Sequence, residues 1–175
     1  LKESGLFENT MVLFFSDNGA EGNPIHNMTE NRNWVAETFD NSLENMGRPG
    51  SYVYTGPGWA QASTGGFRFF KTFPSEGGIR VPAIAAGGGV AADGRTDTFV
   101  SVKDIVPTLL ELSGVEPPGP QYRGREVAPI EGESMISLLR GDSDKVHEAD
   151  YTMGWELFGR RAIIRGDWKL VWIDE

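Results

Sequence analysis

The order of apolar and polar residues predicts strands and helices in alternation. Residues 11–16 read Met-Val-Leu-Phe-Phe-Ser, an unbroken apolar run that leads into Asp-Asn-Gly. A run of this length without alternation is typical of a strand buried on both faces, as in a parallel sheet covered by helices. Residues 80–86 form a second apolar run, and Pro82 limits it to a short or edge-like strand.

Helical spacing is clearest in the segment SVKDIVPTLLELSGVEPP. Ile105, Leu109 and Leu112 share one face, and Gly114 stands where a C-terminal cap belongs. The segment GESMISLLRGD predicts a second, shorter helix that ends at Gly141. The two segments therefore place helices after the second strand.

Pro107 leaves the start of the first helix open. The proline is harmless if Asp104 is the cap, because Pro107 then lies in the first turn. It would kink the helix if the helix began at Ser101. The sequence supports both readings.

The remaining segments differ in character. Residues 23–66 are rich in Asn, Gly and Pro and form a long excursion, in which residues 33–47 hold the pattern for one helix ending at Gly47. The segment RRAIIRGDWKLVWI reads as two strands joined by a two-residue turn at Gly166-Asp167. This order of elements predicts an α/β core with a small antiparallel sheet at its end.

The composition argues against several classes of function. The net charge of −9 argues against a general nucleic-acid binder, and no apolar run reaches the length of a membrane span. There is no cysteine, hence no thiolate metal site and no cysteine nucleophile. The two histidines, His26 and His147, have no second histidine or carboxylate at ligand spacing, so both are expected at the surface. The sequence begins like the tail of a helix and stops within a strand, which predicts a piece of a longer protein.

Asp17 and Asn18 are the first candidate for chemistry. They follow the apolar run at the carboxyl end of the predicted strand, where open α/β sheets bind their ligands. Carboxylate and amide oxygens are hard donors suited to calcium or magnesium. The alternative is a plain turn, because Asp, Asn and Gly are all turn residues. Two ligands do not complete a calcium site, which takes about 6–8 oxygens.

Lys71 is the second candidate. It stands among Phe69, Phe70 and Phe73, so its ammonium could hold an anion in a partly dry pocket. The alternative is a lysine whose stem lies over an aromatic patch with its charge in water. Residues 76–78, Glu-Gly-Gly, require a tight backbone path before the second strand.

These features in this order closely resemble the sulfatase family, and most of all bacterial arylsulfatases of the alkaline-phosphatase superfamily. The resemblance rests on a strand into SDNG, a long insertion, a lysine followed by EGGIRVP, and the DIVPTLLELSG helix. It implies part of an alkaline-phosphatase-like mixed α/β sheet with flanking helices, plus the start of a small C-terminal antiparallel sheet. Residues 1–145 would belong to the catalytic domain, with the insertion at 23–66, and residues 146–175 would begin the C-terminal subdomain.

The resemblance also implies residue roles. Asp17 and Asn18 would be calcium ligands, and Lys71 would contact the sulfate ester's oxygens. Gly77 and Gly78 would shape the approach to the site, together with Arg80. Sulfatases use a formylglycine made from a Cys/Ser-x-Pro-x-Arg motif, which this sequence lacks, so the nucleophile is expected outside this chain and the chain alone is expected to be inactive.

Two other functions stay open. A phosphonate monoester or phosphodiester hydrolase of the same superfamily shares the Asp-Asn type of metal site. A non-catalytic module would bind sulfated glycans or a protein through aromatic residues such as Trp34, Trp59 and Trp155. The expected partner is a small-molecule sulfate ester, with no nucleic acid and no membrane segment. Oligomeric state and compartment are not fixed by the sequence.

Overall fold

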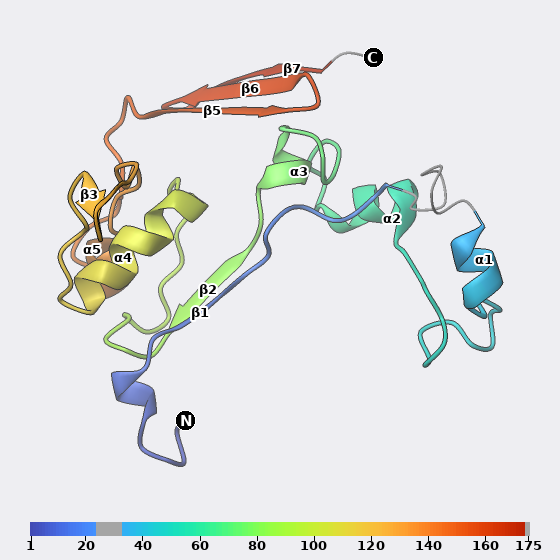
Figure 1. Cartoon of the computed structure of the whole chain (residues 1–175), viewed down its shortest axis with the longest axis horizontal. Helices are drawn as coiled ribbons and strands as arrows, with labels where there is room; N and C mark the ends of the chain where they lie inside the picture. The colour runs from blue at the N-terminus through green and yellow to red at the C-terminus, as the bar shows by residue number, and fades with distance from the viewer. Residues whose placement is uncertain (24–32, 174–175) are drawn as a thin grey trace. The chain divides into compact units, whose positions relative to one another are not determined.

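The structure is a computed structural model that describes residues 1–23 and 33–173. The chain divides into two compact units, each built from two separate stretches (Figure 1). The first unit comprises Leu1–Phe14 and Ala83–Tyr151, and the second comprises Phe15–Pro82 and Thr152–Glu175. The proposed domain boundary at residue 145 stays a prediction.

The first strands form a two-stranded sheet. The short 3-10 helix η1, Phe7–Asn9, precedes β1, Val12–Phe15, which pairs with β2, Ala83–Ala86. The strands run antiparallel, because Gly88 after β2 donates its N–H to the carbonyl of Phe7 before β1. β2 begins directly after Pro82, so the second predicted strand exists but is shorter than residues 80–86.

The prediction that β1 is buried on both faces is wrong. Phe14 is 69% exposed, and neither β1 nor β2 contains a buried residue. Within the described residues β1 has one neighbouring strand, and two strands cannot cover both faces of a ladder. An apolar run therefore predicts the strand but not the elements that would cover it.

Both predicted helices of the first unit are present. The 3-10 helix η4, Val102–Asp104, leads into α4, Ile105–Leu112, and α5 spans Ile136–Arg140. Between them lies a small hairpin of β3, Gln121–Tyr122, and β4, Arg125–Glu126.

The start of α4 combines both readings of the sequence. Ser101 caps the 3-10 turn, while Asp104 is the N-cap of α4, and Pro107 therefore lies harmlessly in the first helical turn. At the other end Gly114 has φ +63° and donates its N–H to Glu111.

The predicted apolar face of α4 is only partly buried. Leu109 is 47% exposed, and the residue of α4 that is fully buried is Thr108. Its hydroxyl donates to the carbonyl of Asp104 at 2.5 Å and accepts the N–H of Met135 at 2.9 Å. A polar side chain with both partners in place thus ties α4 to the start of α5.

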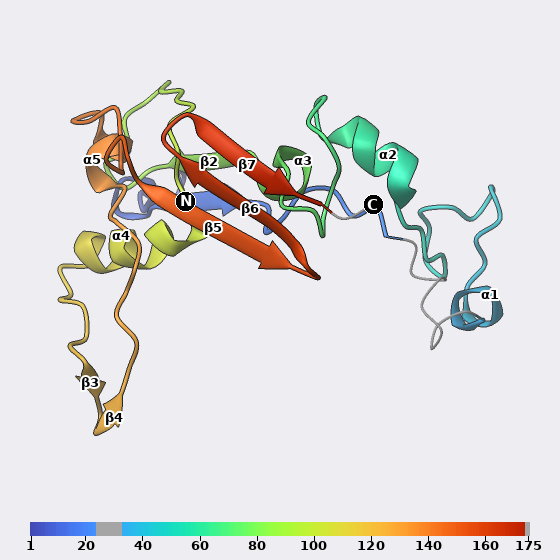
Figure 2. The same ribbon diagram turned by 90° about the horizontal axis from the view of Figure 1, so that it is seen from above.

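The second unit holds the antiparallel sheet at the end of the chain. β5, Thr152–Leu157, β6, Arg160–Arg165, and β7, Trp168–Trp172, pair in the order β5-β6-β7 (Figure 2). The predicted hairpin is confirmed, since Arg165 faces Trp168 across the two-residue turn and Gly166 has φ +53°. The unit also contains α1, Trp34–Thr38, α2, Gly56–Ser63, and α3, Glu76–Ile79.

The predicted helix to Gly47 is wrong beyond its first turn. α1 ends at Thr38, and residues 39–47 contain no helix. The Asp40 carboxylate accepts the N–H of Ser42 at 2.9 Å, and the Asn41 amide oxygen accepts the N–H of Tyr52 at 2.7 Å. Such local side-chain bonds compete with helical hydrogen bonds and favour turns.

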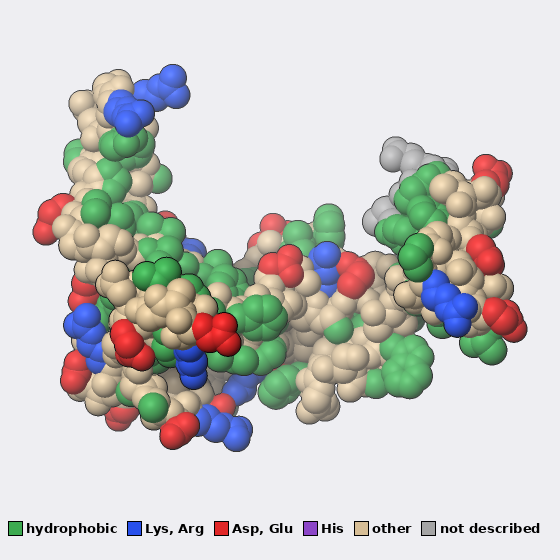
Figure 3. Space-filling model, turned by 90° about the horizontal axis from the view of Figure 1, so that it is seen from below, with side chains coloured by type: hydrophobic (Ala, Val, Ile, Leu, Met, Phe, Trp, Pro, Cys, Tyr) green, Lys and Arg blue, Asp and Glu red, His purple; other side chains and the backbone are tan. Residues whose placement is uncertain are grey.

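The buried core is small. Buried apolar side chains are few in the described residues: Val35, Ala60, Met135, Ile136 and Ala162. Hydrophobic side chains are visible at the surface among charged ones (Figure 3). Much apolar surface is therefore left uncovered by the described part of this chain.

Candidate functional site

The Asp17–Asn18 corner directly follows β1. The Ser16 hydroxyl donates to the Asn18 carbonyl at 2.9 Å, and the Asn18 amide nitrogen donates to the Gly19 carbonyl at 2.9 Å. The donor end of the amide is thus used locally, which leaves its oxygen as an acceptor. In the described part of the chain the exposed Asp17 carboxylate makes no hydrogen bond or ion pair, so both oxygen-bearing groups are available to a cation.

Lys71 lies next to the segment that follows this corner. Its backbone N–H donates to the carbonyl of Ala20 at 3.0 Å. Its ammonium is 3.0 Å from an oxygen of Glu21. Both ends of the lysine are therefore held by residues two and three positions beyond Asn18. The structure brings the three predicted residues into one neighbourhood, while their roles stay a prediction.

Glu21 is a site residue that the sequence did not reveal. One of its carboxylate oxygens accepts the backbone N–H and the side-chain amide of Asn23, each at 2.7 Å, while the other faces Lys71. Partial burial alone would raise the pKa of Glu21, but the bonds from Asn23 and Lys71 outweigh it and hold the pKa below the usual value. Glu21 is therefore a fixed negative charge at neutral pH.

Lys71 carries a permanent positive charge. The hydrogen bond to Glu21 and then the attraction of its charge raise the pKa of Lys71, with a smaller contribution from the Asp17 carboxylate. The lysine is already charged at neutral pH in its unperturbed state. An anion that reaches this corner therefore meets a cation with two carboxylates around it.

Close backbone contacts explain the glycines near the site. Gly19 donates its N–H to the carbonyl of Gly78 at 2.8 Å, and Gly77 donates to the carbonyl of Arg68 at 3.1 Å. A Cβ at Gly77 would overlap the carbonyl oxygen of Phe69. These contacts agree with the structural role that the resemblance implies for Gly77 and Gly78.

Gly77→Ala is expected to lower the free energy of unfolding by about 2–3 kcal/mol, because the obstructing atoms are backbone and cannot rotate away. Urea denaturation of the 175-residue chain measures this. Gly58→Ala in α2 is the matched control, since no atom lies within 4 Å of its added Cβ. Equal unfolding midpoints for the two variants would contradict the close approach.

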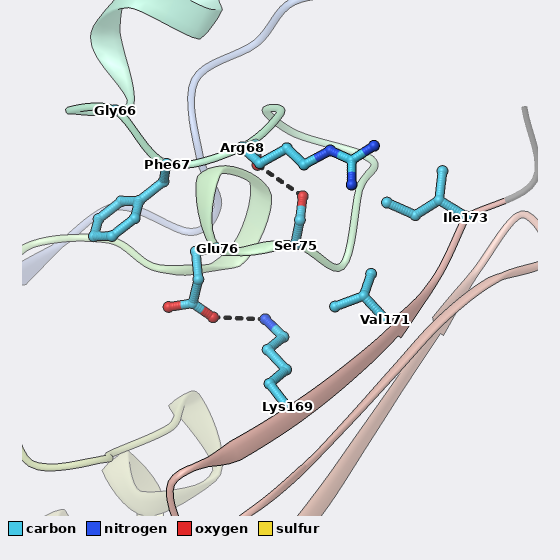
Figure 4. Close-up of a pocket in the computed structure, with 8 residues that line it drawn as sticks. All are labelled: Gly66, Phe67, Arg68, Ser75, Glu76, Lys169, Val171 and Ile173. Carbon is cyan, nitrogen blue, oxygen red and sulfur yellow. Dashed lines mark hydrogen bonds and ion pairs between the residues drawn. The ribbon is translucent and has the colours of Figure 1, made fainter.

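A pocket of about 300 Å³ lies elsewhere in the second unit (Figure 4). The Lys169 ammonium is 2.6 Å from a Glu76 oxygen, and the Ser75 hydroxyl donates to the carbonyl of Arg68 at 2.8 Å. Most of the atoms that line the pocket are apolar, including the stems of the charged side chains. The lining residues are Gly66, Phe67, Arg68, Ser75, Glu76, Lys169, Val171 and Ile173. Neither Lys71 nor the Asp17–Asn18 corner lines it.

The expectation that His147 is a surface residue is wrong. It is 7% exposed, with one ring nitrogen 2.9 Å from Asp104 and the other 3.2 Å from Glu133. Tyr151 stacks on its ring, with centroids 3.9 Å apart. The two carboxylate partners lie 43 and 14 residues from His147 in sequence, so no local pattern marked them. His26 lies outside the described residues.

The chemistry of the Asp17–Asn18 corner suits part of a calcium site, and that role stays a prediction. Both side chains carry hard oxygen donors of the kind that calcium binds. In residues 1–23 and 33–173 no group of three or more His, Cys, Asp or Glu side chains is arranged to hold a metal ion. A calcium ion at this corner therefore needs ligands beyond those that the described chain gathers. Among the helices of the same residues, none combines the length and apolar character needed to cross a membrane.

The comparisons place these features in a known family. The family model described as Sulfatase matches residues 1–115. An uncharacterised sulfatase of Schizosaccharomyces pombe is 42% identical over 175 residues, covering 99% of this chain and 31% of that protein. An arylsulfatase of Klebsiella aerogenes is 35% identical over 141 residues, covering 79% of this chain and 30% of that protein. A mouse steryl-sulfatase is 30% identical over 146 residues, covering 83% of this chain and 18% of that protein.

The chain belongs to the sulfatase family. The members of this family act on sulfate esters, and the family implies an alkaline-phosphatase-like α/β fold, with which the helices and small antiparallel sheets of this chain agree. The chain spans about a third or less of the length of these relatives.

Proposed function

We propose that this chain contributes the Asp17–Asn18 corner and Lys71 to the active site of an arylsulfatase-like enzyme whose remaining site residues lie outside it. The observation that carries the proposal is the anchoring of Lys71, at both backbone and ammonium, to the segment immediately after Asn18. A small anion needs a cation to bind it, and its divalent counter-ion needs hard oxygen ligands. An anchored lysine beside the Asp17–Asn18 corner offers both.

In this proposal the residues act by fixed charge. Lys71 binds a sulfuryl oxygen of the ester and stabilises the negative charge that grows on the sulfuryl group and the leaving oxygen. The carboxylate of Asp17 and the amide oxygen of Asn18 would hold calcium, which when bound supplies further positive charge. The formylglycine nucleophile is expected from the part of the enzyme outside this chain.

A phosphonate monoester or phosphodiester hydrolase is the second candidate, because the same corner and lysine would serve a phosphoryl ester. Rates on sulfate and phosphate esters with the complete enzyme separate the two. The glycan-binding module has less support. Trp34 packs edge-on against Phe39 and Tyr52, and Lys169 lies over the ring of Trp155. Trp59 is 74% exposed, but a single exposed aromatic side chain does not define a binding site.

Asp17→Ala is expected to weaken calcium binding by the complete enzyme by about tenfold or more, because it removes a charged ligand from the ion. Isothermal titration calorimetry with calcium chloride measures the affinity. Asp142→Ala, which removes an exposed carboxylate beyond α5, serves as the control and should leave the affinity unchanged. Equal affinities for Asp17→Ala and the unmodified enzyme would contradict the assignment.

A further inference from the structure

The proposed reaction needs the positive charge of Lys71, yet the structure sets Glu21 directly against it. The Glu21 carboxylate lies 3.0 Å from the Lys71 ammonium. We propose that Glu21 is a specificity-determining residue, whose carboxylate lowers the affinity of this corner for doubly charged tetrahedral esters more than for singly charged ones. The inference rests on the proposed function, in which Lys71 binds the ester's oxygens.

Glu21 is held in place independently of Lys71. Its second oxygen accepts both the backbone N–H and the side-chain amide of Asn23. The carboxylate is therefore not free to turn away when an anion approaches the ammonium. This sets it apart from an exposed pair such as Lys145–Glu148, where the carboxylate has, among the described residues, a hydrogen bond to the lysine alone.

The position of the Glu21 carboxylate determines the electrostatic force on an anion that approaches Lys71. An anion that contacts the Lys71 ammonium at hydrogen-bond distance lies about 5 Å from the nearer Glu21 oxygen, given tetrahedral directions at the nitrogen. The Asp17 carboxylate adds a further negative potential at the same lysine. Every unit of negative charge on the ligand is thus attracted by Lys71 and repelled by the Glu21 carboxylate, and in the metal-free chain by Asp17 as well.

This arrangement separates esters by charge. A sulfate monoester carries one negative charge, whereas a phosphate monoester carries close to two above its second pKa of about 6. The repulsion from Glu21 doubles with the second charge, so Glu21 lowers the affinity for a doubly charged ester more than for a singly charged one. Because Lys71 and Glu21 are 41% and 42% exposed, water screens this repulsion, and we expect Glu21 to shift the ratio of the two affinities by about tenfold. Phosphodiesters and phosphonate monoesters also carry one charge, so Glu21 would lower their affinity no more than that of a sulfate monoester.

The test uses the 175-residue chain with an isotopically labelled lysine side chain, in metal-free buffer. Methyl sulfate and methyl phosphate are titrated at pH 8 while the NMR signals of Lys71 are followed. We expect the ratio of the methyl sulfate affinity to the methyl phosphate affinity to be about tenfold higher in the unmodified chain than in Glu21→Gln. At pH 5, where methyl phosphate carries one charge, we expect the two chains to give the same ratio.

Glu21→Gln keeps an oxygen for the two Asn23 donors but removes the charge, so at pH 8 it should strengthen methyl phosphate binding by about tenfold more than methyl sulfate binding. Glu148→Gln makes the same change in net charge at a surface lysine pair and should alter neither affinity. The same affinity ratio in the unmodified chain and in Glu21→Gln at pH 8 would overturn the inference while leaving the role of Lys71 intact. If neither anion shifts the Lys71 signals, the proposed anion-binding role of Lys71 fails, and the inference fails with it.

Discussion

Lys71→Ala in the complete enzyme is expected to lower kcat/KM on a chromogenic aryl sulfate by about 10²–10³-fold, the loss typical when one preorganised group that stabilises developing negative charge is removed. The ammonium is held by Glu21 at 3.0 Å, and the backbone of Lys71 is tied to Ala20, so the charge is in position before the ester arrives. Steady-state rates measure the effect.

Lys145→Ala is the control for Lys71, because Lys145 forms an exposed ion pair with Glu148 in the first unit and should leave kcat/KM unchanged. A Lys71→Ala enzyme within threefold of the unmodified one would contradict the role of the lysine. Turnover by the 175-residue chain alone, abolished in Lys71→Ala, would contradict the proposal that the nucleophile lies outside this chain.

Asp104→Ala is expected to lower the free energy of unfolding by about 3–5 kcal/mol, because it removes a buried acceptor from several hydrogen-bonding partners at about 1–3 kcal/mol each. Asp104 is fully buried and accepts the N–H groups of Ser101 at 2.6 Å and of Glu133 at 3.0 Å. It also pairs with His147 at 2.9 Å. Alanine would leave all three partners without their acceptor inside the first unit.

Urea denaturation of the 175-residue chain measures the effect of Asp104→Ala. Asp104→Asn, which keeps the shape and one acceptor oxygen, should fall between alanine and the unmodified chain. The exposed Asp142→Ala should stay within about 0.5 kcal/mol. A loss below about 1 kcal/mol for Asp104→Ala would mean that the buried network contributes little to stability.

The sequence predictions that were confirmed rested on short-range signals, such as glycines at turns and helix ends. Gly166-Asp167 specified the turn between β6 and β7, because a two-residue hairpin needs a residue that tolerates positive φ. Gly114 and Gly141, with φ +63° and +82°, ended α4 and α5 as expected. Each of these signals acts within a few residues of the backbone that it shapes.

The predictions that failed depended on contacts between distant residues. The apolar run of β1 specified a strand, but burial requires neighbours, and Phe14 is exposed. Asp104 and His147 are 43 residues apart in sequence, so no local pattern marked the histidine as buried. The partnership of Glu21 with Lys71 was hidden for the same reason, since it forms only when the fold brings the two segments together.

The most direct test of the site is the proximity of Lys71 to a metal ion at the Asp17–Asn18 corner. Mn²⁺ can replace calcium at oxygen ligands and broadens the NMR signals of nearby nuclei. In the complete enzyme, added Mn²⁺ should broaden the side-chain signals of Lys71 but not those of Lys145, and Asp17→Ala should abolish the effect. If Mn²⁺ binds in a way that depends on Asp17 but the Lys71 signals stay sharp, Lys71 and the metal ion do not share one site, and the proposed shared site is contradicted.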